Sequence, residues 1–526
     1  MQVGGRLSQP RPGSTTAGGS RATAVALGAL CTLLFLTFLD NTVVSVGLGS
    51  LQTDLKASVA DLQWVIGAYA LTFASIMLAC GMIGDELGRK KVMLAGAGVF
   101  CAGSILCALA PNAQVLIAGR AIMGLGAAAS EPGTLSVLRQ MYTNDRARAR
   151  AIGVWSAVSG LALALGPVIG GAIVGAWNWR GIFWFNLAFG LAALLVAAAV
   201  VPESSDPTAA RVDTVGTLLG AGALATLIFG IIDAETSSFG APVPLTLFCV
   251  AVALGAAFVW WEHRAANPLI SPRLFRLPQF ATPNFVAFCT YFSTFAIFFF
   301  TALYLVEVIG DSGYRIALVF APMTVLMIIS SVFAGYWTGR TGPRWPITIG
   351  CALFGAGLLL ADPLISPHPD YVLLSLALTL AGIGIGITVV PVTSAVLNAV
   401  PPERSGMAAS ASNTSREVGA VTGVAVLGAI VFSQINSSLT THLVQLGVPV
   451  AYKTLILEFI ETGQVVGVNV NNYTSNPIVG KVIGAAYAAF GDGVHLALYV
   501  SGALMLFAAL LAFVTLRKTA ERNTAP

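Results

Sequence analysis

Long apolar runs are the feature that most constrains how this chain can fold. They extend over about 18 to 28 residues, and a helix of about 20 residues is long enough to cross the hydrocarbon core of a bilayer. Charged residues make up only 10% of the 526 positions, against about 25% in soluble domains. Because a water-exposed surface cannot be built from so few charges, the sequence predicts an integral membrane protein.

Fourteen apolar segments are separated by charges or by clusters of Pro, Gly and Asn. They begin near residues 24, 62, 92, 114, 151, 182, 215, 244, 283, 315, 346, 371, 408 and 494. The sequence therefore predicts an all-α polytopic membrane protein with 14 transmembrane helices, whose two termini lie on the same side.

The distribution of Lys and Arg predicts which side that is. With the N-terminus inside, cytoplasmic segments hold twenty of the 27 basic residues and the opposite side holds five. Basic loops are retained in the cytoplasm, so both termini are expected to be cytoplasmic. The arginine-rich and Ala/Gly-heavy composition indicates the cytoplasmic (inner) membrane of a bacterium.

Two string matches indicate an internal repeat. The segments 81–90 and 335–344 match at an offset of 254 residues, and segments beginning at 144 and 402 match at an offset of 258. This spacing equals six helices plus an inserted pair. Two parallel six-helix halves around a midplane site are typical of secondary transporters.

The repeat predicts five parts of the chain. They are a disordered cytoplasmic tail (1–21), an N-terminal six-helix bundle (22–201), a linker with two inserted transmembrane helices (202–282), a C-terminal six-helix bundle (283–516) that includes a long external loop (434–493), and a cytoplasmic tail (517–526).

Residue patterns for catalysis and metal binding are missing from the sequence. All seven cysteines lie in apolar runs without CxxC or His-paired spacing, and the four histidines are far apart. No catalytic pair, nucleotide loop or nucleic-acid-binding basic tract occurs in the polar segments. We therefore expect no metal, no cofactor and no nucleic-acid partner.

A membrane enzyme is disfavoured, and so is a channel, because the few intramembrane charges do not form a continuous polar pore.

The short turn after the second span has the sequence GMIGDELGRKKVML at 81–94. Its glycines permit positive φ, Asp85 can face a helix N-terminus, and the basic residues suit an anionic leaflet, although a plain positive-inside turn also explains those bases. With Gly81, Asp85, Gly88 and Arg89 together, the string resembles the signature loop of the major facilitator superfamily. That resemblance implies a latch between the two halves in the outward-open state.

Other strings are similar to the fourteen-helix drug:proton antiporter branch of that family. They are LDNTVVSVGLGSLQTDL (39–55), WVIGAY (64–69), RAIMGLGAA (120–128), GPVIGG (166–171), WNWRGIFWFN (177–186) and SNTSREVG (412–419). The resemblance implies that the string in span 4 holds a buried arginine linked to proton transfer.

Span 5 carries Gly160, Gly166, Pro167, Gly170 and Gly171, which resemble the motif found in antiporters that export their substrates. Proline removes a backbone hydrogen bond and glycine removes side-chain bulk, so a bent, closely packed helix is expected. Ordinary glycine-mediated helix packing also explains the glycines.

Five positions depart from the branch pattern. Gly49 and Ala188 replace prolines, Met123 and Glu417 replace glutamines, and Glu131 occupies a normally apolar place. The changes at Met123 and Glu131 are expected to bear on substrate choice or coupling.

Charged residues inside the spans predict the site. Each costs about 2.5 to 3.5 kcal/mol at a helix centre, and Asp40 and Arg120 lie at similar expected depths in spans 1 and 4, so we predict that they pair. The pair is either a static contact that orients helices or a proton-coupling site that protonation or substrate binding breaks.

Glu131 follows Arg120 by eleven residues, or three helical turns, and is expected on the same face about 16 Å deeper. It is either a proton or cation site or a hydrogen-bonded neutral acid without a transport role. We expect the substrate cavity to be lined by four further residues. They are Asn41, Asn413, Arg416 and Glu417.

Together these features predict a secondary active transporter. It would export hydrophobic, often cationic compounds such as drugs, antibiotics and dyes in exchange for protons, by alternating access, with membrane lipids around it. The alternative is a dedicated proton-coupled exporter of one metabolite, such as an antibiotic, siderophore or lipid precursor. The sequence does not give the oligomeric state, and a monomer is compatible with it.

Overall fold

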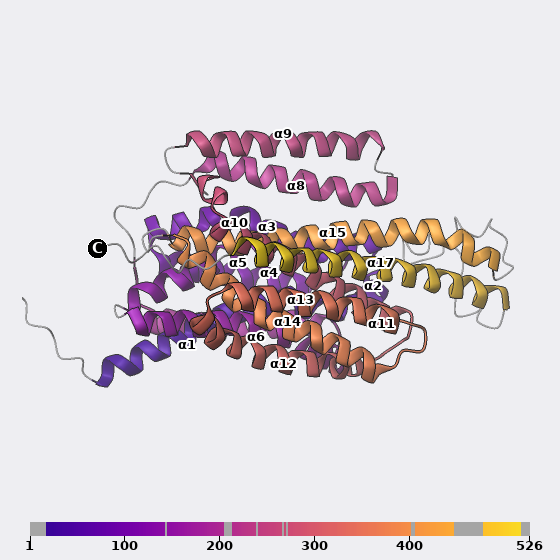
Figure 1. Cartoon of the computed structure of the whole chain (residues 1–526), viewed down its shortest axis with the longest axis horizontal. Helices are drawn as coiled ribbons and strands as arrows, with labels where there is room; N and C mark the ends of the chain where they lie inside the picture. The colour runs from indigo at the N-terminus through magenta and orange to yellow at the C-terminus, as the bar shows by residue number, and fades with distance from the viewer. Residues whose placement is uncertain are drawn as a thin grey trace, which may run out of the picture.

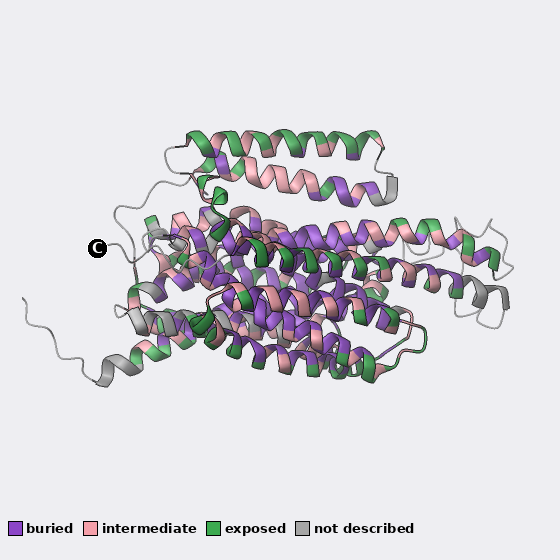
Figure 2. Ribbon diagram, viewed as in Figure 1, coloured by how far each residue is buried: buried purple, intermediate pink, exposed green. Residues whose placement is uncertain are grey.

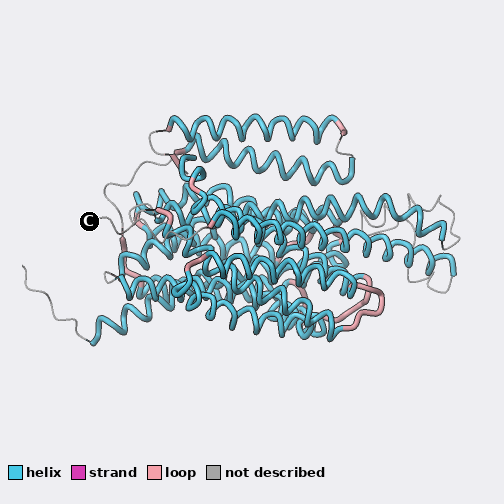
Figure 3. Tube along the Cα trace, viewed as in Figure 1, coloured by secondary structure: helices cyan, strands magenta, loops and turns pink. Residues whose placement is uncertain are grey.

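The computed structural model describes residues 17–142, 145–204, 213–237, 240–265, 268–269, 272–400, 405–445 and 477–516. These residues form helices joined by short connections, with no strand among them (Figure 3). Thirteen helices are long and apolar enough to cross a membrane, and α6 is a further helix of 32 residues. The predicted all-α polytopic fold with fourteen long helices is confirmed.

The N-terminal half contains six long helices, of which the first is prolonged by a 3₁₀ turn and a short helix. Their bounds are α1 Ala17–Val43, η1 Val44–Gly47, α2 Leu48–Leu55, α3 Val59–Leu87, α4 Arg89–Ala108, α5 Ala113–Met141, α6 Asp145–Ala176 and α7 Arg180–Val200.

The C-terminal half follows a short 3₁₀ turn and also has six long helices, the first of which is interrupted by a fully buried π-helical segment, η3. The bounds are η2 Pro272–Arg276, α10 Pro278–Phe295, η3 Ala296–Thr301, α11 Ala302–Glu307, α12 Gly313–Thr341, α13 Arg344–Ala361, η4 Asp362–Leu364, α14 Tyr371–Asn398, α15 Ser405–Gln445 and α17 Pro477–Thr515.

Two helix pairs make the most extensive contacts between the two halves. Helix α3 packs against α15, and α6 packs against α12. Helix α1 begins and α17 ends at the same end of the bundle, on the left in Figure 1. Burial is concentrated where the long helices meet, and the outward faces are exposed (Figure 2).

The inserted pair consists of α8 (Thr214–Ser237) and α9 (Pro242–Arg264), which lie side by side along one flank of the bundle (Figure 1). Helix α8 packs against both α3 and α15, and the rings of Trp64 and Phe229 lie 5.8 Å apart at the contact with α3. The pair therefore covers one seam between the halves, while most of α9 remains exposed (Figure 2).

The internal repeat is visible in the helix caps. Ser58 caps α3 and Ser312 caps α12, an offset of 254 residues, while Asn112 caps α5 and Asp370 caps α14, an offset of 258. Each side chain accepts a hydrogen bond from a backbone N–H that the first helical turn leaves free. These are the two offsets found in the sequence strings.

Close helix contacts repeat with the same offsets. A Cβ on Gly126 would lie 2.3 Å from the backbone nitrogen of Phe100, and one on Gly384 would lie 2.3 Å from that of Phe354. The small residues thus bring α4 against α5 and α13 against α14 in the same way. The two halves are built on one packing plan.

Two helices extend into the segment 434–493, and its place as an external loop stays a prediction. Helix α15 continues to Gln445 and α17 already begins at Pro477, because Leu439 and Leu443 pack in a buried stripe although their neighbours are polar. Loss of hydropathy therefore marked the end of the apolar pattern and not the end of the helix. Residues 446–476 lie outside the described residues.

Most of the predicted tail segments also lie outside the described residues. The structure describes the chain from Ala17, where α1 begins, so the expected boundary at residue 21 falls inside this helix. Nothing tests the remaining domain boundaries, which stay predictions.

Replacing Gly88 by Ala should lower the midpoint temperature of unfolding of the detergent-purified protein. Gly88 ends α3 with φ at +114°, and a Cβ there would lie 3.0 Å from a carboxylate oxygen of Glu203. A side chain in such a conformation costs about 1 to 3 kcal/mol. The matched control is Gly84→Ala inside α3, where a Cβ meets only ordinary contacts. This variant should leave the stability unchanged or raise it by about 0.5 to 1 kcal/mol. Equal midpoints for the two variants would contradict this assignment.

Candidate functional site

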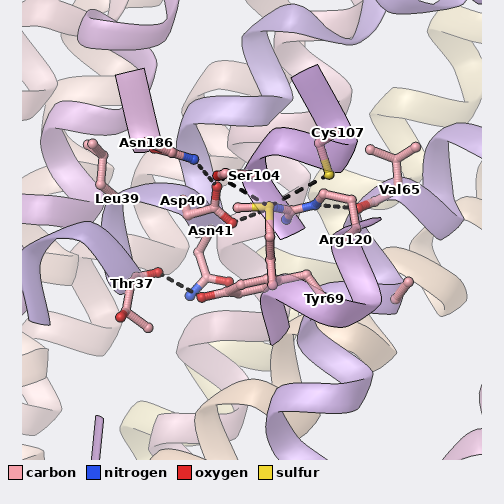
Figure 4. Close-up of polar contacts among 12 residues, drawn as sticks. Thr37, Leu39, Asp40, Asn41, Val65, Tyr69, Ser104, Cys107, Arg120 and Asn186 are labelled. Atoms are coloured by element: carbon pink, nitrogen blue, oxygen red, sulfur yellow. Dashed lines mark hydrogen bonds and ion pairs between the residues drawn. The ribbon is translucent and has the colours of Figure 1, made fainter. Parts of the chain in front are cut away.

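A buried carboxylate on α1 is bound by donors from two other helices of the N-terminal half (Figure 4). Asp40 is fully buried and forms an ion pair with Arg120 of α5. Asn186 of α7 donates a hydrogen bond of 2.6 Å to the second carboxylate oxygen. The predicted contact between Asp40 and Arg120 is therefore present, and each carboxylate oxygen of Asp40 has a donor.

The arginine of this pair is fixed on every side. Arg120 donates from Nε to the carbonyl oxygen of Val65 at 2.8 Å, and its guanidinium lies 4.5 Å from the ring centre of Tyr69. The Tyr69 hydroxyl in turn donates to the carbonyl of Thr37 at 3.1 Å. The pair is thus a neutral unit held rigidly by α1, α3, α5 and α7.

Met123 lies directly beside this ion pair. Its sulfur is 4.0 Å from Nη1 of Arg120 and is also close to Ser104 and Cys107. At this departure from the branch pattern, a polarisable thioether takes the place of an amide.

A second group of buried polar side chains lies between the two halves. Asn413 of α15 donates a hydrogen bond to one carboxyl oxygen of Glu131 on α5. Reciprocally, Asn41 of α1 donates to one carboxyl oxygen of Glu417 on α15 at 3.4 Å. Each carboxyl group is therefore held by a carboxamide from the opposite half.

Arg416 lies between these two links. It donates to Asn413 Oδ1 at 3.4 Å and to the hydroxyl of Thr393, and its guanidinium lies 5.7 Å from the ring centre of Tyr291. The three ionisable side chains of this group are each at most 2% exposed, yet none of the ion pairs among the described residues includes them. We name the five residues the interface cluster. They are Asn41, Glu131, Asn413, Arg416 and Glu417.

Two oxygens of the interface cluster have no partner. Oε2 of Glu131 and Oε2 of Glu417 are buried, and neither has a hydrogen-bond donor among the described residues. Leaving a buried polar atom without a hydrogen bond costs about 1 to 3 kcal/mol, and more if the group is charged. Both carboxyl groups therefore bear a desolvation cost that no hydrogen bond in the described part of the structure offsets at these oxygens.

All four predicted cavity residues thus belong to one cluster. Glu131 lies with them rather than with Asp40 and Arg120, the residues with which it was grouped as a proton-coupling site. Sequence reasoning missed Asn186 as a partner of Asp40, although a lone amide in an apolar helix is a signal for a buried hydrogen bond.

The predicted signature loop is a tight turn that contacts the end of α7. The backbone N–H of Arg89 donates to the carbonyl of Ser204 at 2.8 Å, and that of Lys90 donates to the carboxylate of Glu203 at 3.0 Å. A carboxylate is thus placed at the N-terminus of α4, where the helix dipole favours it. Gly81 lies inside α3, and the side chain of Asp85 is outside the described part of the structure.

The predicted glycine motif lies on α6, which packs against α1. A Cβ on Gly170 would lie 2.5 Å from the carbonyl oxygen of Val43, and one on Gly166 would overlap Thr42. Pro167 lies within the helix. These contacts fall two and three residues beyond Asp40, so the close packing is next to the buried ion pair. Gly171 is buried, and the surroundings of Gly160 lie outside the description.

Comparison with known proteins gives consistent matches. A family model described as the Major Facilitator Superfamily matches residues 30–424. The "Multidrug resistance protein Stp" of Mycobacterium tuberculosis (strain CDC 1551 / Oshkosh) is 32% identical over 78% of this chain and 76% of its own length. The "Methylenomycin A resistance protein" of Bacillus subtilis (strain 168) is 34% identical over 80% and 88%. The "Multidrug efflux pump LfrA" of Mycolicibacterium smegmatis (strain ATCC 700084 / mc(2)155) is 28% identical over 96% and 98%.

Solved structures with the same fold are more distant in sequence. A bacterial homolog of the human lysosomal transporter Spinster, in an inward-facing and unoccupied conformation, aligns with a TM-score of 0.63 at 17% identity, over 96% of this chain and 98% of that one. The human organic anion transporter MFSD10 (TETRAN) aligns with a TM-score of 0.56 at 15% identity, over 94% and 100%. These likenesses concern the fold alone.

Replacing Asn186 by Leu should destabilise the protein, because Asp40 loses a buried hydrogen bond to a charged group worth about 1.5 to 3 kcal/mol. We expect a lower midpoint temperature of unfolding in detergent. Asn398→Leu is the matched control, since Asn398 is exposed and its side chain makes only a 3.4 Å contact to Ser394. A midpoint for Asn186→Leu that equals the control would show that the bond does not stabilise the fold.

Proposed function

Because the chain belongs to the Major Facilitator Superfamily, we propose that it exports hydrophobic, often cationic small molecules such as drugs, antibiotics and dyes in exchange for protons. Export is supported by the names of two relatives, a multidrug resistance protein and a multidrug efflux pump. The chain is a multi-pass membrane protein. In this proposal it lies in the cytoplasmic membrane of a bacterium, with both termini in the cytoplasm. The bias of Lys and Arg towards one side supports this orientation.

The observation that most supports proton coupling is the buried ion pair of Asp40 and Arg120. A proton on Asp40 would remove the negative charge and leave the Arg120 guanidinium without its counterion in a dry site. Such an unpaired buried charge costs several kcal/mol, so protonation favours a different arrangement of α1 and α5. Protonation of Asp40 would thereby change how α1 packs against α5.

The position of Asp40 also links the pair to the other half. The next residue, Asn41, donates across the interface to Glu417, so a movement of α1 at Asp40 changes a contact between the two halves. The glycines of α6 allow close sliding against this same part of α1. In the proposed cycle, the halves rock about the midplane, and the loop with Gly81, Asp85, Gly88 and Arg89 acts as the conformational switch.

A second candidate is a dedicated exporter of one metabolite. It is favoured by a relative named "Tetracenomycin C resistance and export protein" from Streptomyces glaucescens, which is 29% identical over 96% of this chain. Growth of a host in the presence of many unrelated inhibitors, with and without the gene, separates the two candidates. Protection against structurally unrelated compounds supports the broad exporter, and protection against a single class supports the dedicated one.

Asp40→Asn should abolish proton-driven efflux, reducing transport to the rate of protein-free vesicles. The amide keeps the shape of the side chain but carries no charge and accepts no proton. The measurement is substrate transport in proteoliposomes with an imposed pH gradient. Asp54→Asn is the matched control, because Asp54 also pairs with an arginine, Arg180, but is half exposed at the end of α2. Full transport by Asp40→Asn, with normal insertion, would rule out Asp40 as the coupling residue.

A further inference from the structure

Two basic residues occupy corresponding places in the two halves, at the end of the bundle where α17 ends (left in Figure 1). Lys90 lies at the start of α4 and Arg344 at the start of α13, and the repeat offset of 254 residues relates them. Each side chain donates to a carbonyl oxygen near the end of the sixth long helix of its half. Lys90 binds Ala198 at 2.7 Å and Arg344 binds Phe513 at 3.0 Å.

The acidic residues beside these two bases differ. In the N-terminal half, Glu203 accepts a hydrogen bond of 3.0 Å from the backbone N–H of Lys90, so a carboxylate lies next to this base. Glu203 follows Ala198 by five residues, whereas the residue five positions after Phe513 is Lys518. By this count, the sequence of the C-terminal half has a base where that of the N-terminal half has an acid.

The helices around Arg344 hold no acid near it. Helices α10, α12, α13 and α14 contain no Asp or Glu. The one acid of α17, Asp492, precedes Phe513 by 21 residues, or about 32 Å along the helix. No ion pair among the described residues includes Arg340 or Arg344. These two arginines therefore carry positive charge without a counter-charge in the described part of the structure.

Exposed aromatic rings hold both guanidinium groups at the surface. Arg340 lies 4.1 Å from the ring centre of Tyr336, one turn earlier on α12, and Arg344 lies 4.6 Å from that of Phe513. Trp345 packs edge-on against Phe513, with 5.7 Å between the ring centres. The three rings are between 40% and 58% exposed. Stacking covers one face of a guanidinium and leaves the N–H groups at its edge able to bind an anion.

We propose that Arg340 and Arg344 bind the phosphate group of an anionic phospholipid. Guanidinium groups form paired hydrogen bonds with phosphate oxygens. The neighbouring apolar side chains Val332, Phe333 and Val514 are also exposed, which suits acyl chains and not a soluble anion. Three residues separate the two arginines, so the chain keeps their Cα atoms within about 14 Å of each other, and one headgroup reaches both.

The lipid phosphate thus supplies to the C-terminal half the negative charge that Glu203 supplies to the N-terminal half. Arg344 connects the start of α13 to the end of α17 through its hydrogen bond to Phe513, and Arg340 lies on α12, which packs against α6 of the other half. The bound lipid therefore contacts a helix of the interface between the halves. The site is independent of the exported compound, because lipid binding requires no transport.

The decisive experiment measures lipid binding by native mass spectrometry. The full-length protein, freed of lipid in detergent, is titrated with palmitoyl-oleoyl phosphatidylglycerol and, separately, with phosphatidylcholine of the same acyl chains. We expect the first phosphatidylglycerol to bind roughly tenfold more tightly, and Arg340→Gln and Arg344→Gln each to weaken it about fivefold, the contribution of one arginine at a membrane surface. Equal binding of the two lipids, or unchanged phosphatidylglycerol affinity in either variant, would overturn the proposal.

Lys90→Gln is the matched control, because it removes the corresponding base from the other half. Lys90 has a carbonyl partner and a carboxylate beside it, so its loss should leave the affinity for phosphatidylglycerol unchanged. An equal loss of affinity in Lys90→Gln and Arg344→Gln would show that the lipid responds to total charge, which would overturn the site.

Two further measurements separate lipid binding from folding and from a soluble anion. Arg340→Gln removes no hydrogen bond of the described structure, so without lipid its midpoint temperature of unfolding should equal that of the unaltered protein. Phosphatidylglycerol should then raise this midpoint less in the variant, and an equal rise in both proteins would contradict the site. An excess of inorganic phosphate at constant ionic strength should not displace phosphatidylglycerol, whereas displacement would assign the site to soluble phosphate and overturn the proposal.

Discussion

The buried ion pair between Asp40 and Arg120 determines how four helices of the N-terminal half pack together. A charge inside the membrane is costly unless it has a partner, and here Asn186, Val65 and Tyr69 from the surrounding helices also contact the ion pair. Four helices of the N-terminal half are thereby fixed relative to one another. Neutralising Asp40 would therefore remove the ion pair that holds these four helices together.

The interface cluster has the opposite character. The N-terminal pair is complete, with every charge matched, whereas the cluster between the halves has an unmatched count of acids and bases and two oxygens without donors. The two groups of residues are joined through Asp40 and Asn41, which are adjacent on α1. In the proposed mechanism, a change at either group therefore acts on the same turn of α1.

Much of the fold was predictable from the sequence because apolar length and charge bias are strong signals in membrane proteins. The repeat offsets found in two short strings return in the caps of α3 and α12 and of α5 and α14. The full length of α15 was not predictable, because this helix continues to Gln445 after its sequence becomes polar. Hydropathy marks the apolar part of a helix, and it does not reveal a polar stretch that stays helical because Leu439 and Leu443 are buried.

The candidate site was predictable only in part. Depth along two helices was enough to pair Asp40 with Arg120, but the partner of Glu131 lies in the other half, 282 residues away, and no helical spacing reveals it. In the proposed mechanism, movement of substrate is coupled to movement of protons. The decisive measurement imposes an inward substrate gradient on proteoliposomes at equal pH and records the lumenal pH. Coupled exchange makes the lumen alkaline as substrate enters, whereas substrate entry without any change in lumenal pH would rule out coupling.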